Sequence, residues 1–157
     1  MAIETVIHDK NTRDFLKGKI KKVEEITKNG QSYVNLLSII VFKDIQNHFK
    51  NEEGPDGKWA PWSKMYQEHM EKIGRGSNNI LQFSGHLRKA FVPTNYKTSS
   101  EGITWYNSAR TKDGAPYAAD HQYGTNRMPA RSFMWLSDKG QEDIAKQTLA
   151  FLEDEKT

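Results

Sequence analysis

Hydrophobic and polar residues follow a helical period most clearly between Ser32 and about Lys50. One stripe of this segment is apolar at helical spacing and comprises Val34, Leu37, Val41, Ile45 and Phe49. Neighbouring apolar residues such as Leu36 and Ile39 widen this surface almost around the helix. The pattern predicts a helix that is central to the fold, or that is half core and half subunit interface.

Weaker patterns predict further elements at both ends of the chain. Residues 2–8 alternate as a short strand, and a first helix runs from residue 11 or 12 to the Asn29-Gly30 pair, where a left-handed cap costs little. A last helix begins at Asp138, which resembles the first residue of a capping box with Gln141. The inner face of this last helix is expected to carry Ile144, Ala145, Leu149 and Leu152.

In the middle of the chain, serine and glycine residues mark the ends of three short helices. Ser63 is placed to cap a helix that runs to about Ile73. Ser84 is placed to cap a second short helix. Tyr117 to Tyr123 are expected to form one or two helical turns that end at Gly124.

Three further segments are predicted as strands, at residues 91–98, 102–108 and 131–136. Glu101 and Gly102 are expected at the bend of a hairpin between the first two. The element order β, α, α, α, β, β, β, α indicates an α+β fold with a helical N-terminal half, a small mainly antiparallel sheet and a C-terminal helix. A chain of 157 residues without internal repeats is expected to form one domain, covering residues 1–157.

Composition narrows the class of protein. Only 36% of the residues are hydrophobic, but four Trp, seven Phe and six Tyr supply bulky surface for a core. The longest mostly apolar run, residues 36–42, is far shorter than the roughly 20 residues of a membrane-spanning helix. The chain has no cysteine for disulfides or thiolate metal sites, and its first residues do not resemble a secretion signal. We therefore expect a protein without membrane contact that stays where it is made.

The net charge of +3 is unevenly distributed. The stretch from Lys72 to Ser100 has no acidic residue but contains Lys72, Arg75, Arg88, Lys89 and Lys97. The segment Glu153-Asp154-Glu155 near the C-terminus has the opposite charge. We hypothesise that the basic stretch is a docking surface for an acidic partner subunit, largely on a mobile loop before assembly.

Residue types that commonly act in catalysis or metal binding do not occur here in the motifs that such sites require. The five histidines form no zinc-binding motif, and His48 with Glu52, four positions later, is interpreted as a solvent-facing pair. No serine lies in a nucleophile elbow, and the loop at residues 74–77 lacks the ending of a phosphate-binding loop. We therefore predict no catalytic residue, no metal site and no cofactor.

Four segments, called motifs 1 to 4 below, have residue types that suggest geometric constraints. Motif 1 comprises Pro55, Asp56, Gly57, Trp59, Ala60, Pro61 and Ser63, and motif 2 comprises Ile80, Leu81, Ser84, Gly85 and Leu87. Motif 3 comprises Tyr117, Ala118, Ala119, His121, Gln122, Tyr123 and Gly124. Motif 4 comprises Met128, Pro129, Ala130, Arg131, Phe133, Leu136 and Ser137.

In this order and spacing, the four motifs resemble those of the phage virion morphogenesis family, the tail-completion proteins of Mu-like and P2-like tailed phages and prophages. The chain departs from that pattern in three places. One residue instead of two separates Gly57 from Trp59, Ser132 stands in place of a second Pro, and Trp135 stands where Gly is common. The resemblance implies a virion structural protein at the head-proximal end of the tail or at the neck, without catalysis or cofactor.

For several motif residues, two interpretations are open, one in which the side chain packs within the fold and one in which it binds a partner. Trp59 and Trp62 are expected to anchor the core or a loop, with contact of one of them to a partner subunit as the alternative. His121 is expected to be a buried, hydrogen-bonded histidine that fixes the following loop, and Gln122 offers both a donor and an acceptor there. Arg131 either pairs with a buried carboxylate such as Asp120 or faces an adjoining subunit.

The leading function hypothesis is a structural protein that completes the phage tail and joins head to tail as a ring-forming homo-oligomer. Its partners would be other tail or neck proteins, met first in the host cytoplasm during assembly and then in the virion. The alternative is a nucleic-acid-binding module in which Arg75, Arg88, Lys89 and Lys97 hold phosphates and Phe83, Phe91 or Tyr96 stack on bases. The modest net charge and the lack of a known nucleic-acid-binding signature favour the first hypothesis.

Overall fold

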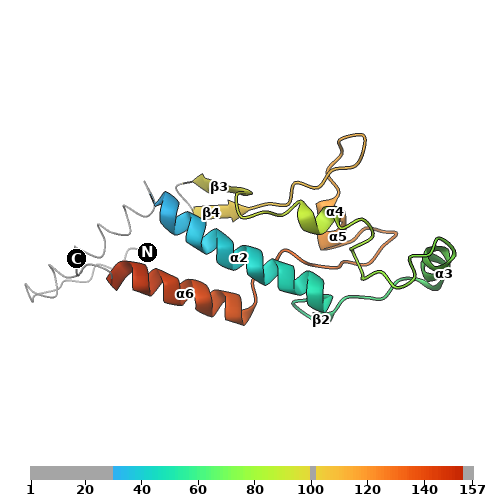
Figure 1. The fold of residues 1–157 in the computed structure, drawn as a ribbon, viewed down its shortest axis with the longest axis horizontal. Coiled ribbons are helices and arrows are strands. Elements are labelled where there is room, and N and C mark those ends of the chain that lie inside the picture. Colours follow the sequence, from blue (N-terminus) through green and yellow to red (C-terminus); the bar gives the residue numbers. More distant parts are fainter. Residues whose placement is uncertain (1–29, 100–101, 154–157) are drawn as a thin grey trace, which may run out of the picture.

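The computed structural model describes residues 30–99 and 102–153. The strand predicted at residues 2–8 and the first predicted helix lie outside these residues. Helix α2 (Gln31–Asn51) is central, and α6 (Asp138–Glu153) packs along it (Figure 1). All five residues of the apolar stripe on α2 are buried, as predicted, while Leu36 and Ile39 are exposed.

The remaining elements are short and form a mixed α+β fold, as expected. They are β1 (Glu53–Gly54), β2 (Gly57–Lys58), α3 (Lys64–Lys72), α4 (His86–Lys89), β3 (Tyr96–Ser99), β4 (Gly102–Trp105) and α5 (Ala118–Tyr123). The strands form two separate antiparallel pairs, β1 with β2 and β3 with β4. In the first pair Gly54 lies opposite Gly57, so Pro55 and Asp56 form the tight turn between them. In the second pair Ser99 lies opposite Gly102.

The core lies where the chain after α2 packs back against that helix. Its buried members are Val41, Ile45, Phe49, Trp59, Leu87, Phe91, Ala109 and Phe133. The ring of Phe49 meets Trp59 edge to face, with centroids 5.7 Å apart, and lies 5.2 Å from the ring of Phe133. Motifs 1 and 4 therefore meet at the end of α2.

The prediction of a strand at residues 131–136 is wrong. This segment has no partner strand among the described residues, and its backbone groups bond instead to side chains of motifs 1 and 3. The other two predicted strands are real but shorter than expected. Local alternation of apolar residues therefore did not distinguish a strand from an extended segment fixed by side chains.

Two expectations for α6 are also corrected. Ser137, not Asp138, caps the helix, because its Oγ accepts a hydrogen bond of 3.0 Å from the backbone N–H of Gly140. On the predicted inner face, Leu149 is 58% exposed and Ala145 is also exposed. The turns that face α2 instead carry Gly140, Ile144 and Thr148, whose Oγ1 bonds the hydroxyl of Tyr33.

A candidate site: the groove built by four motifs

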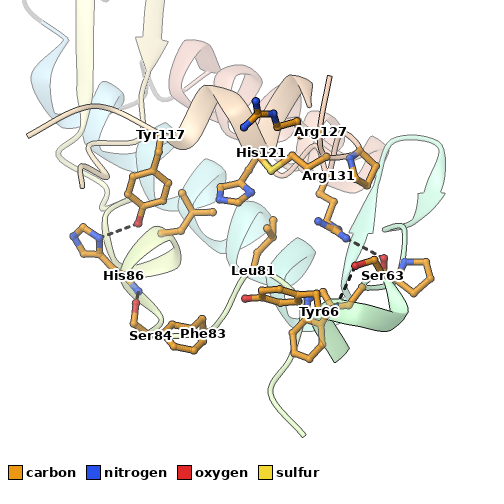
Figure 2. Close-up of a pocket in the computed structure, with 15 residues that line it drawn as sticks. Ser63, Tyr66, Leu81, Phe83, Ser84, His86, Tyr117, His121, Arg127 and Arg131 are labelled. Atoms are coloured by element: carbon orange, nitrogen blue, oxygen red, sulfur yellow. Dashed lines mark hydrogen bonds between the residues drawn. The ribbon is translucent and has the colours of Figure 1, made fainter. Parts of the chain in front are cut away.

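A groove of about 670 Å³ opens between α3, α4 and α5 (Figure 2). Residues from all four motifs line it: Pro61, Ser63, Leu81, Ser84, Leu87, Tyr117, His121, Met128, Pro129 and Arg131. Of the other lining residues, the sequence analysis considered binding roles for Trp62 and Phe83 but did not single out Tyr66, His86 and Arg127. The motifs are thus spread over the chain but converge on one surface.

Motif 1 is fixed to motif 4 by hydrogen bonds in both directions. The buried Trp59 donates from its indole N–H to the backbone oxygen of Ser132 at 2.9 Å. Arg131 donates from Nε to the oxygen of Ala60 at 2.8 Å and from Nη2 to that of Pro61 at 3.0 Å. Arg131 therefore does not pair with Asp120, as the sequence analysis had considered, but holds the chain that enters α3.

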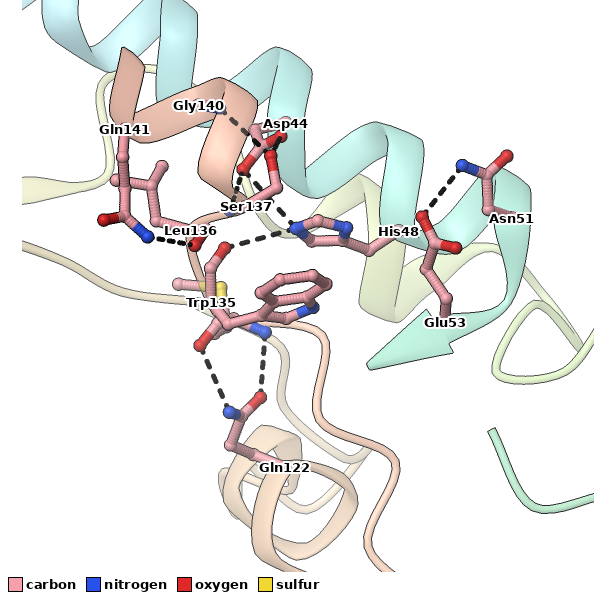
Figure 3. A network of polar contacts seen from close by, with 11 residues as sticks. Asp44, His48, Asn51, Glu53, Gln122, Trp135, Leu136, Ser137, Gly140 and Gln141 are labelled. Atoms are coloured by element: carbon pink, nitrogen blue, oxygen red, sulfur yellow. Dashed lines mark hydrogen bonds and ion pairs between the residues drawn. The ribbon is translucent and has the colours of Figure 1, made fainter. Parts of the chain in front are cut away.

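The side chain of Gln122 in motif 3 makes hydrogen bonds to the backbone of motif 4 that a neighbouring strand would make in a sheet (Figure 3). Its Oε1 accepts hydrogen bonds from the backbone N–H groups of Phe133 at 3.0 Å and Met134 at 2.8 Å. Its Nε2 donates to the backbone oxygen of Met134 at 3.2 Å. The expected double role of Gln122 as donor and acceptor is confirmed, and it explains why this segment is extended without a sheet.

Two glycines shape the walls of the groove. Gly124 ends α5 with a φ of 74°, and a Cβ there would lie 2.6 Å from the backbone nitrogen of Ala130. Gly85 precedes α4 with a φ of 69°, which a residue with a side chain adopts only with strain. Beside it, the Oγ of Ser84 accepts a 3.3 Å hydrogen bond from the N–H of His86. The prediction that Ser84 caps α4 is nevertheless wrong, because the N-cap residue is Gly85 and no side chain caps this helix.

The second and third motifs meet at the rim of the groove. The Nδ1 atom of His86 and the hydroxyl of Tyr117 are 2.9 Å apart and share a hydrogen bond. Leu87, on the next position of α4, is buried and contributes to the core. Ser63 caps α3 as predicted, because its Oγ accepts a 3.3 Å bond from the N–H of Tyr66.

The groove lining contains cations but no carboxylate. Arg131 is only 8% exposed, and it makes no ion pair among the described residues. Burial lowers the pKa of Arg131, because a charged guanidinium is less well solvated there. Burial, and then the nearby Arg131, lower the pKa of His121, which favours the neutral imidazole. An occupant that brings a carboxylate would compensate the buried positive charge.

His121 differs from the expected hydrogen-bonded histidine. Its ring lies edge-on to Tyr117 with centroids 5.8 Å apart, and its buried Nδ1 has no hydrogen-bond partner in the described part of the chain. The backbone of the same residue does fix the following loop, because its oxygen accepts a 2.7 Å hydrogen bond from the N–H of Arg131.

The remaining motif residues stabilise the scaffold around the groove. Pro55, Asp56 and Gly57 form the exposed turn between β1 and β2. Phe133 is fully buried, and Leu136 is half-buried against the core. Ala118 packs against the core, and Ala130 lies against Gly124. Ser137 lies outside the groove and bonds Asp44 of α2.

The five cations of the basic stretch are distributed along the molecule. Lys72 ends α3, whereas Lys97 lies on β3, well separated from α3 along the long axis (Figure 1). Arg75 donates from Nη1 to the oxygen of Phe83 at 2.7 Å and lies 4.4 Å from the centroid of that ring. Arg88 donates to Gln46 at 2.6 Å and to Gln82 at 3.2 Å, while Lys89 is exposed on α4. The Nζ atom of Lys97 lies 5.7 Å from the ring centroid of Tyr106. Three of the five cations, namely Arg75, Arg88 and Lys97, therefore contact other residues of the same chain.

A buried polar cluster between α2 and α6 was missed by the sequence analysis (Figure 3). His48 is 2% exposed, lies 3.5 Å from a carboxylate oxygen of Asp44, and stacks on Trp135 with ring centroids 4.1 Å apart. The interpretation of His48 and Glu52 as a solvent-facing pair is therefore wrong. Glu52 instead accepts a 2.6 Å hydrogen bond from the N–H of Ile80. The i, i+4 spacing of Asp44 and His48 was the available signal.

Residues 30–99 and 102–153 contain neither a metal-binding cluster nor a membrane-spanning helix. No group of three His, Asp or Glu side chains in this part of the chain is placed to hold a metal ion. No helix in the same part is long and apolar enough to cross a membrane.

Comparison with known proteins identifies the family. A model of the phage virion morphogenesis family matches residues 12–153, a range that contains all four motifs. The chain belongs to this family. One relative of this family member is the Uncharacterized protein MJ0331 of Methanocaldococcus jannaschii, 32% identical over 106 residues that cover 66% of this chain and 72% of the relative. No solved structure matches the chain.

Proposed function

We propose that this member of the phage virion morphogenesis family is a structural tail-completion protein that joins head to tail at the neck. The observation that carries the proposal is the convergence of the four motifs on one groove. Those motifs resemble tail-completion proteins, and here they meet through hydrogen bonds between residues up to 73 positions apart. Such a surface is typical of a docking site held on a rigid scaffold.

The lining of the groove supports binding of a protein partner. Tyr66 and Phe83 are exposed there although both are large and aromatic, and Arg127 is exposed beside them. Tyrosine, phenylalanine, methionine and arginine are enriched at protein interfaces. We expect the partners to be other tail or neck proteins together with further copies of this chain in a ring. We expect assembly in the host cytoplasm, a final place in the virion, and neither catalysis nor a cofactor.

The proposal is tested in the phage or prophage that carries the gene. A deletion is compared with the same deletion complemented by the wild-type gene, and lysates are examined by electron microscopy. We expect DNA-filled heads and finished tails that remain separate, with joined particles restored by complementation. Mass spectrometry of purified virions and of isolated tails should find the protein in the tail or neck.

Two outcomes would contradict the proposal. Normal infectious particles from the deletion strain would exclude a required role in joining. Joined particles that lack or lose DNA would instead favour the nucleic-acid-binding alternative, in which Arg75, Arg88, Lys89 and Lys97 contact phosphates.

A further inference from the structure

The groove and the end of α6 lie at opposite ends of the long axis (Figure 1). The last turns of α6 pack against the start of α2, where the rings of Phe151 and Tyr33 are 4.9 Å apart. The groove lies beyond the other end of α2, next to the start of α3. The α6 end of a chain therefore does not occupy the groove of that same chain.

The end of α6 presents an apolar and an acidic side chain together. Leu149 is 58% exposed, and Glu153 is also exposed. They are four positions apart on one helix, so they lie on the same face. Thr148 and Phe151 hold the helix on Tyr33 from the other side. Asp154 and Glu155 follow in the sequence and add negative charge.

The groove has the complementary properties. Tyr66 and Phe83 provide exposed aromatic surface, and no carboxylate lines the groove. Arg127 is exposed, and its side chain has no hydrogen bond or ion pair among the described residues. Arg131 is buried in the wall, where its charge is compensated by backbone carbonyl oxygens alone. An acidic, amphipathic helix end suits such a surface.

We propose that the α6 end of one copy docks into the groove of a second copy, with Leu149 on the aromatic lining and the Glu153 carboxylate beside Arg127. The two surfaces differ and lie at opposite ends, so the contact is head to tail. Repetition of a head-to-tail contact closes a ring if the rotation between copies permits it. This inference specifies the interface of the ring included in the proposed function. Its test uses purified protein, so it can fail or succeed independently of the role in tails.

The test measures the self-association of the full chain by sedimentation and by light scattering at increasing concentration. We expect the wild type to self-associate, and Arg127→Glu or Glu153→Lys to weaken this association at least about tenfold. Leu149→Glu should have the same effect because it places a charge against aromatic surface. Lys112→Glu and Asp113→Lys are matched controls on an exposed loop and should leave association unchanged. Circular dichroism verifies that each variant is folded.

Mixing the variants distinguishes this contact from others. Arg127→Glu retains an intact α6 end, and Glu153→Lys retains an intact groove. A mixture of the two should therefore regain association, because the original contact and the charge-reversed contact can alternate along the assembly. The double variant that carries both changes in one chain should also recover association. A wild type that stays monomeric at its highest soluble concentration would overturn the proposal. Equal losses in the control variants, or no rescue in the double variant, would also overturn it.

Discussion

Asp44 and Ser137 lie 93 residues apart in the sequence and share two hydrogen bonds (Figure 3). The Oγ of Ser137 donates to Oδ1 of Asp44 at 2.5 Å, and the backbone N–H of Ser137 donates to Oδ2 at 2.8 Å. The same Oγ caps α6 by accepting from Gly140. A buried carboxylate in the middle of α2 therefore fixes both the place and the start of α6.

Replacement of Ser137 by alanine tests this link. The change removes the cap of α6 and one hydrogen bond to a charged group, so we expect the free energy of unfolding to fall by about 1 to 3 kcal/mol. Urea unfolding followed by circular dichroism measures the difference. Ser77→Ala, in an exposed loop, is the control. Equal stability of the two variants would contradict the role of the Asp44 contact.

Gly140→Ala should destabilise the protein although alanine favours helices. A Cβ at this position would lie 2.6 Å from Oδ2 of Asp44 and 2.9 Å from Cδ1 of Leu136. Overpacking should cost about 1 to 3 kcal/mol and helix propensity should return roughly 1 kcal/mol, so we expect a net loss of up to about 2 kcal/mol. The loss, measured by urea unfolding, should be smaller in an Asp44→Ala background. A stabilised Gly140→Ala protein would show that α6 moves away at no cost.

Trp59→Ala should cost about 3 to 5 kcal/mol, because the side chain is buried in the core and its indole N–H holds Ser132. Trp62→Ala is the comparison, since Trp62 is half-buried in the groove wall and should cost less. Thermal and urea unfolding measure both effects. A stable, folded Trp59→Ala protein would mean that Trp59 has a binding role instead.

Stability should decrease as the pH falls below about 6.5. Burial lowers the pKa of His48 from its ordinary value of 6.5, although the nearby Asp44 raises it in part. The unfolded chain therefore binds more protons than the folded chain between the folded-state pKa and 6.5. The contribution of His48 to the free energy of unfolding is fully present above pH 6.5 and decreases as the pH falls through this window. Below the window this contribution does not change further. His121, whose pKa is lowered too, acts in the same direction.

The pH dependence is measured by urea unfolding between about pH 7.5 and pH 5. His48→Phe keeps an aromatic ring against Trp135 but removes the titrating group, so its stability should change less with pH than that of the wild type. His69→Phe, which changes an exposed histidine of α3, is the matched control. If the free energy of unfolding of the His48→Phe protein changes with pH as steeply as that of the wild type, other groups cause the pH dependence.

Local rules predicted the elements whose signals are contained in a few neighbouring residues. The period of apolar residues located α2, Ser63 marked the start of α3, and Gly124 marked the end of α5. These predictions succeeded because hydrogen bonds within a helical turn and the φ angle of one residue are short-range properties. The same rules failed at residues 131–136, whose hydrogen-bond partners lie elsewhere in the chain.

The α+β class, the central helix and, through the order of the four motifs, the family could be predicted from the residues alone. The folded chain was needed to show that those motifs enclose one groove, that Arg131 pairs with carbonyl oxygens, and that Leu149 faces outward. Periodicity shows which residues share a face of a helix, but not what covers that face. Burial and the pairing of a charge depend on segments that fold back from distant positions, and here side chains such as Gln122 and Asp44 determine where those segments lie.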